Sequence, residues 1–209
     1  MELKKQKRKD WIKGILLIVL LFAVAFVVLY IYGYIQRTGE EIVNKTNEFD
    51  KIEKYGYVLY DNATDYYKAE FSKLKEMEND EDIASQVAKL FVIDLYSIDY
   101  KINKYEVTSS QYFYSSKREM HRQKVLDNFY NFVEDNSYAD RKQELPEVKN
   151  VEVLKNEKDT YKLGDKSVDS YVISLKIEYV KDMGYDKKSV VTLVKDGETN
   201  ISVVSYKAL

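Results

Sequence analysis

The chain has 209 residues, with 33 Lys and Arg against 35 Asp and Glu, one His and no Cys. This near balance provides no electrostatic footprint for nucleic acid, which is bound by clustered Lys and Arg, so no nucleic-acid partner is expected. The absence of Cys excludes disulfides and Cys-His dyads, and no catalytic motif is recognisable, so we expect no enzyme activity and no cofactor.

Residues 14–36 carry no charged side chain and are mostly apolar. A helix rises about 1.5 Å per residue, so this stretch is long enough to cross a hydrocarbon core of about 30 Å. The sequence therefore predicts a transmembrane helix in contact with membrane lipid. A cleaved signal peptide is the alternative, but its apolar region would be only about 7–15 residues long.

Charges on either side of this helix predict its orientation. Residues 1–13 are rich in Lys and Arg, whereas the residues just after the helix are mostly acidic. By the positive-inside rule, residues 1–13 form a cytoplasmic basic tail and the rest of the chain lies outside. We therefore expect a single-pass protein of the cell membrane, with a mostly polar stalk over 37–56 and an extracytoplasmic domain over 57–209.

The first half of the domain has helical periodicity. Apolar residues at helical spacing predict three helices, over 58–77, 83–98 and 116–133. The cluster 79–82 offers an N-cap to the second helix, and Ser116 with Glu119 fits a capping box for the third. Because the second helix is apolar on its back as well as its front, we expect it to be buried on more than one side.

After Pro146 the apolar period changes to two, which is typical of strands with one packed face. Four strands are predicted, over 150–162, 171–180, 188–195 and 200–207. Each link between them contains a Gly with polar neighbours, as expected for turns of an antiparallel meander. The predicted fold class is therefore α+β, with helices packed on one face of a four-stranded antiparallel sheet.

Glu70 and Asp94 are the candidate site residues with ionisable side chains. Both lie on or beside apolar helix faces, where an unpaired charge is costly and a shifted pKa is expected. If they share a cavity between helices and sheet, they could bind a ligand or do acid–base work. Otherwise each is paired with a Lys or Tyr at the core boundary, which is the interpretation we favour.

Tyr66 and Tyr67 are candidate contacts to a pocket or a partner, because they belong to a Tyr-rich part of the chain. The alternative is that their rings pack and leave the hydroxyls in water. The only histidine, His121, falls at the edge of the third helix's apolar face and is expected to be half-buried. The acidic cluster 79–82 lacks the spaced ligands and Gly of a calcium loop, so no metal site is predicted.

The order of these elements is a basic tail, one span, a stalk, helices that include Tyr-Tyr-Lys-Ala-Glu-Phe at 66–71, and a four-strand meander. This layout resembles the bitopic assembly factors of type IV secretion and conjugation machines. The resemblance implies a nuclear-transport-factor-2-like extracytoplasmic domain, an α+β cone with a curved sheet. The Asn-Pro-x-Gly turn associated with proteobacterial members has no counterpart, so the resemblance assigns no residue a role.

These observations predict a membrane-anchored extracytoplasmic scaffold or interaction protein, a component of a conjugation or secretion apparatus. Its partners would be other envelope proteins, with weak homo-oligomerisation. The alternative is an anchored ligand-binding or sensory domain with a pocket between helices and sheet. A cavity of a few hundred Å³ with converging polar groups would favour the alternative.

Overall fold

The computed structural model describes residues 23, 25–31, 55–60, 62–197 and 200–209. The chain divides into two compact units, Met1–Asp50 and Lys51–Leu209, which are considered separately. In the first unit, residues 25–31 are helical and their side chains are exposed. In the described part of the chain, we find no helix with both the length and the apolarity needed to traverse a bilayer.

Several sequence predictions fall on residues outside this description. The basic tail 1–13, most of the predicted span 14–36 and nearly all of the predicted stalk 37–56 lie there. In the second unit, Tyr55 and Tyr57 are already buried in the hydrophobic core. The folded part of the domain thus includes Tyr55, inside the segment predicted as stalk.

The second unit contains one antiparallel sheet in the order β1-β2-β3-β4, which confirms the predicted meander. Its strands are β1 (Val148–Leu163), β2 (Lys166–Tyr179), β3 (Lys188–Asp196) and β4 (Asn200–Ala208). The two-residue turn between β1 and β2 places Gly164 at a φ of 63°, which favours glycine. The predicted α+β fold class is confirmed for this unit.

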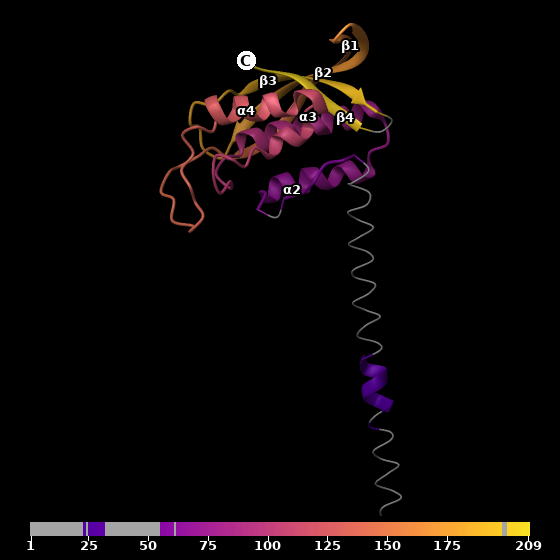
Figure 1. Cartoon of the computed structure of the whole chain (residues 1–209), viewed down its shortest axis with the longest axis vertical. Helices are drawn as coiled ribbons and strands as arrows, with labels where there is room; N and C mark the ends of the chain where they lie inside the picture. Colours follow the sequence, from indigo (N-terminus) through magenta and orange to yellow (C-terminus); the bar gives the residue numbers. More distant parts are fainter. Residues whose placement is uncertain (1–22, 24, 32–54, 61, 198–199) are drawn as a thin grey trace, which may run out of the picture. The chain divides into compact units, whose positions relative to one another are not determined.

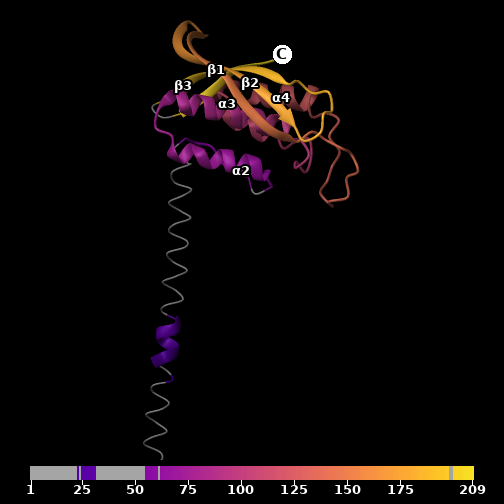
Figure 2. The same ribbon diagram turned by 180° about the vertical axis from the view of Figure 1, so that it is seen from behind.

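The β1–β2 hairpin extends beyond the rest of the sheet. β1 pairs with β2 from Val148 to Leu163, whereas β2 pairs with β3 only over Ser170–Lys176. The end of the hairpin therefore forms a curled two-stranded ribbon, visible at the upper edge of the domain in Figures 1 and 2. Its side chains are mostly exposed.

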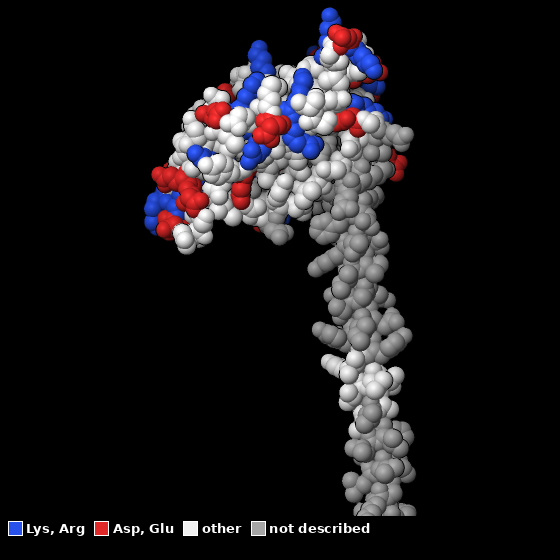
Figure 3. Space-filling view, in the orientation of Figure 1, with Lys and Arg blue, Asp and Glu red and all other residues white. Residues whose placement is uncertain are grey.

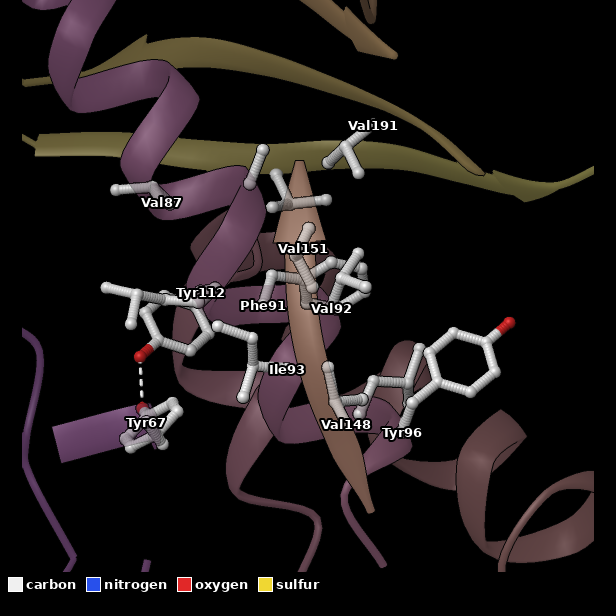
Figure 4. Close-up of a cluster of buried hydrophobic side chains, with 14 of the residues drawn as sticks. Tyr67, Val87, Phe91, Val92, Ile93, Tyr96, Tyr112, Val148, Val151 and Val191 are labelled. Carbon is white, nitrogen blue, oxygen red and sulfur yellow. Dashed lines mark hydrogen bonds between the residues drawn. The ribbon is translucent and has the colours of Figure 1, made fainter. Parts of the chain in front are cut away.

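Helices cover one face of the sheet in two layers, as Figures 1 and 2 show. α3 (Asp80–Tyr96) lies against the sheet, and α2 (Asp65–Ser72), which continues as the 3₁₀ helix η1 (Lys73–Glu76), lies on the far side of α3. α3 is therefore enclosed from both sides, as predicted from its apolar back. Figure 4 shows the α3 residues Phe91 and Val92 near Val151 of β1.

The first predicted helix, 58–77, is too long at its start. α2 begins at Asp65, where the Thr64 side chain caps it by accepting a hydrogen bond from the Tyr67 amide. Residues 55–60 are not helical, because this segment instead places Tyr55 and Tyr57 in the core. Tertiary burial of these rings overrides the local helical pattern.

The third predicted helix, 116–133, is also shorter in the structure. A 3₁₀ turn, η3 (Ser115–Lys117), precedes α4 (Arg118–Asn128), and no side chain caps α4, so the predicted capping box is wrong. At the other end, the side-chain amides of Asn128 and Asn131 donate to backbone carbonyls four residues earlier. Such local bonds compete with helix continuation and account for the early end.

The contrast between the two predicted caps gives a stability test. Asn79 does cap α3, and its Oδ1 accepts a hydrogen bond from the Asp82 amide at 2.8 Å. We expect Asn79→Ala to lower the free energy of unfolding by about 1 kcal/mol, because it removes this bond. Ser116→Ala is the matched control and should be nearly neutral. Equal losses for the two variants in chemical denaturation would contradict the assignment of the caps.

Candidate functional site

Glu70 is buried between α2 and α3 and is fully paired. Its carboxylate accepts hydrogen bonds from Lys73 at 2.6 Å and from Gln86 and Lys89, each at 2.9 Å. Burial alone would raise the pKa of Glu70, but these donors outweigh it and hold the pKa below its ordinary value. Glu70 is 5% exposed and pairs with two lysines, so the favoured interpretation of a carboxylate paired at the core boundary is confirmed.

Asp94 lies in a second, deeper network. Its Oδ1 accepts hydrogen bonds from Lys101 Nζ at 2.8 Å, from the Tyr100 hydroxyl at 2.6 Å and from Thr108. Both Asp94 and Lys101 are 0% exposed. Among the described residues, Asp94 Oδ2 has no hydrogen-bond partner. Burial, followed by the charge of Asp94, raises the pKa of Tyr100 well above its ordinary value.

Glu70 and Asp94 are therefore not brought together. Glu70 joins α2 to α3, whereas Asp94 joins the end of α3 to the loop that follows, and their hydrogen-bond partners do not overlap. Each pairs with a Lys, as the favoured interpretation expects. The carboxylates act here as structural ties between segments.

The two candidate tyrosines lie in different environments. The Tyr66 hydroxyl accepts a hydrogen bond from the Val151 amide at 2.8 Å and donates to Asn150 Oδ1, so it satisfies part of the β1 edge. Tyr67 is 1% exposed, and its hydroxyl is hydrogen-bonded to that of Tyr112, as Figure 4 shows. Tyr67 is thus a core residue, whereas Tyr66 is half-buried beside the sheet edge.

A cavity of about 440 Å³ lies elsewhere, between the end of α3, α4 and the outer edge of β4. We call it the α4–β4 groove. It is lined by Leu95, Tyr96, Phe113, Lys117, Met120, His121, Lys124, Val125, Phe129, Asp186, Val204, Ser205, Tyr206 and Ala208. None of the four candidate site residues is among them. Its floor is buried, but exposed Met120 and Ser205 leave it open to solvent.

Polar groups converge on this groove from two sides. At one end, the Tyr96 hydroxyl bonds to the Tyr206 hydroxyl at 2.5 Å and donates to Asp186 Oδ2 at 3.2 Å. On the α4 side, Lys117 Nζ donates to the Tyr161 hydroxyl and to the Val204 carbonyl. The Lys124 side chain has no ion-pair or hydrogen-bond partner within the described ranges, and it lines the groove. Its charge is thus available to a ligand.

His121 contributes an uncharged ring to the groove. It stacks on Phe113 with ring centroids 3.9 Å apart and is buried, rather than half-buried as predicted. Burial, opposed by the charge of Asp94, lowers the pKa of His121 to about 4, so the imidazole is neutral at pH 7. Its Nε2 lies 3.4 Å from the Ser109 hydroxyl, but among the described residues no carboxylate is hydrogen-bonded to the other ring nitrogen, as a catalytic triad requires.

Sequence reasoning missed Lys124, Asp186 and Tyr206 as a set. They come from a helix, a loop and the last strand, and only the folded topology brings them to one groove. The apolar face that includes Val125 and Phe129 was the one signal, because it marks the side of α4 that must meet another element. Over the described residues, no three His, Asp or Glu side chains are arranged to hold a metal ion.

Comparison with known proteins does not assign the chain: no family model, curated protein or solved structure matches it.

The role of Glu70 can be tested through the pH dependence of stability. We expect Glu70→Gln to cost about 1 kcal/mol at pH 7, because a neutral amide replaces a charged acceptor of two lysines. Since folding lowers the pKa of Glu70, its contribution is present above the ordinary value of 4.5 and is lost as the pH falls below it. The difference between wild type and Glu70→Gln should therefore shrink on acidification in urea titrations.

Glu119→Gln provides a matched control for this experiment. Glu119 is 80% exposed and its ion pair with Arg122 is 3.6 Å long, so its loss should be close to neutral at every pH. If both variants had equal stability, Glu70 would not be the tie between α2 and α3 that its contacts indicate.

Proposed function

We propose that the chain is a membrane-anchored extracytoplasmic scaffold or interaction protein that binds its partner without converting it. The observation that carries this proposal is the α4–β4 groove, which has an apolar floor and an unpaired Lys124 at its rim. By contrast, the buried carboxylates Glu70 and Asp94 are each held by lysine. The groove therefore suits the binding of a partner, whereas the buried carboxylates stabilise the folded domain.

The membrane assignment within this proposal rests on the uncharged run 14–36 and the basic residues ahead of it. We further propose that the protein is a component of a conjugation or secretion apparatus. The support is the layout of helices followed by a four-strand antiparallel meander. On the face drawn in Figure 3, basic and acidic side chains of the described residues are interspersed, which favours protein partners over nucleic acid.

One observation favours the alternative, an anchored domain that binds a small ligand. The groove has a volume of about 440 Å³, and Asp186, Tyr206 and Lys124 converge on it. Pockets for small molecules have about this size and usually combine apolar walls with a few polar groups. The two functions differ in the occupant of one groove, so experiments on partners discriminate between them.

Topology is tested with reporter fusions. A reporter that is active only outside the cytoplasm should be active when fused after Leu209, because the positive-inside rule places the domain outside. The same reporter fused ahead of Lys4 should be silent. A reporter active only in the cytoplasm serves as the reciprocal control, and the reversed pattern would refute the compartment assigned here.

Partner binding is tested by purification of the full chain in detergent after crosslinking in intact cells. We expect a defined set of envelope proteins to co-purify, and weak self-association to appear on concentration. A chain with the charge-reversing substitution Lys124→Glu is the comparison, since it alters the groove at an exposed side chain. A protein that brings down no envelope protein and stays monomeric would count heavily against a scaffold.

A further inference from the structure

A bulge of one residue interrupts the pairing of β4 with β3. Thr192 pairs with Ser205 and Leu193 pairs with Val203, so Val204 is an extra residue in β4. The Leu209 amide donates to the Lys188 carbonyl of β3. Because backbone groups of an antiparallel strand alternate in direction, the N–H and C=O groups of Tyr206 and Ala208 point away from β3. They face the α4–β4 groove, which both residues line.

The protein itself already places an extended segment on this edge. Phe113 pairs with Val203 as an isolated parallel bridge, and the Tyr114 amide donates to the Val203 carbonyl at 2.9 Å. Phe113 has extended backbone angles, φ −78° and ψ 145°. The chain then turns away into η3, so this pairing stops at the start of the groove. Beyond it, the edge from Ser205 to Ala208 has no strand beside it among the described residues.

The walls of the groove suit the side chains of an added strand. In a strand, alternate side chains project to opposite faces, so one set would enter the groove between β4 and α4. That set would meet Met120, Val125 and Phe129, which are apolar. The other set would project to the opposite face, where Lys207 of β4 is exposed, and Lys117 and Lys124 add positive charge at the groove against Asp186 at one end.

We propose that the β4 edge binds an extended, acidic segment of a partner protein by strand addition, with its apolar side chains in the α4–β4 groove. The segment continues along the line that Phe113 begins, and its backbone pairs with Tyr206 and Ala208. This mode takes affinity from main-chain hydrogen bonds and specificity from alternate side chains. The inference rests on the proposed function, because it names the kind of protein that the interaction domain recognises.

The test uses the full chain in lipid nanodiscs and a fluorescent nine-residue peptide that alternates Glu and Val. We expect saturable binding by fluorescence anisotropy, together with slower hydrogen exchange at the Tyr206 and Ala208 amides. Two control peptides separate the contribution of charge from that of backbone hydrogen bonds. Replacing Glu with Lys should weaken binding by charge repulsion, and N-methylation of the central Val should weaken it about tenfold by removing a backbone donor.

Variants of the protein locate the site. Lys207→Glu should weaken binding of the acidic peptide by about two- to fivefold, which is the range for an exposed ion pair on the face to which the glutamates project. Lys166→Glu, at the β1–β2 turn, is the matched control and should leave binding unchanged. Ala208→Pro removes an amide that points away from β3, so it should abolish the added pairing and keep the melting temperature close to that of wild type.

Several outcomes would overturn strand addition. Equal binding of the N-methylated peptide, or protection confined to β1, would place recognition elsewhere. Displacement of the peptide by a single-chain fatty acid at equal concentration would make the groove a lipid site. If envelope proteins still co-purify with the Lys207→Glu and Ala208→Pro variants, the interaction function stands and only this surface is wrong. If neither peptide nor protein binds, both proposals fail.

Discussion

The ion pair between Asp94 and Lys101 is the constraint on which the rest of the domain depends. Both residues are 0% exposed, and a charge in such surroundings is tolerated only when it is paired and hydrogen-bonded. Removing either partner would leave the other charge buried and uncompensated, at a typical cost of about 3–5 kcal/mol. The pair therefore fixes where the chain must run after α3, because Lys101 and Thr108 have to return to Asp94.

This return path determines the position of the groove. The segment that carries Thr108 continues through η2 (Thr108–Tyr112) to Phe113, which reaches the β4 edge at Val203. α4 follows a few residues later and is set at a distance from β4, with Phe113 and His121 stacked at the floor between them. The buried ion pair in the core is thus connected, through about a dozen residues of irregular chain, to the α4–β4 groove. This groove is open to solvent and accessible to a binding partner.

Sequence reasoning predicts this fold well where periodicity is strong and poorly where tertiary contacts decide. The four strands and α3 follow from alternation and from an apolar surface all round. The start of α2 was missed because burial of Tyr57 competes with local helix formation, and the length of α4 because asparagine side chains end it. Glu70 was predicted to be paired, and it is. The groove could not be predicted, because it depends on how α4 stands beside β4 and on a one-residue bulge at Val204.

The hydrogen-bonded hydroxyls of Tyr67 and Tyr112 in the core make the stability of this domain sensitive to alkali. Burial is the largest cause that raises the pKa of Tyr67 and Tyr112 well above the ordinary value, so these hydroxyls keep their protons in the folded state. In the unfolded chain they would ionise near pH 10. Stability from this source is complete below that pH and is lost as the pH rises above it. Phenolate absorbance should then report cooperative unfolding, since deprotonation of these rings must wait until the core opens.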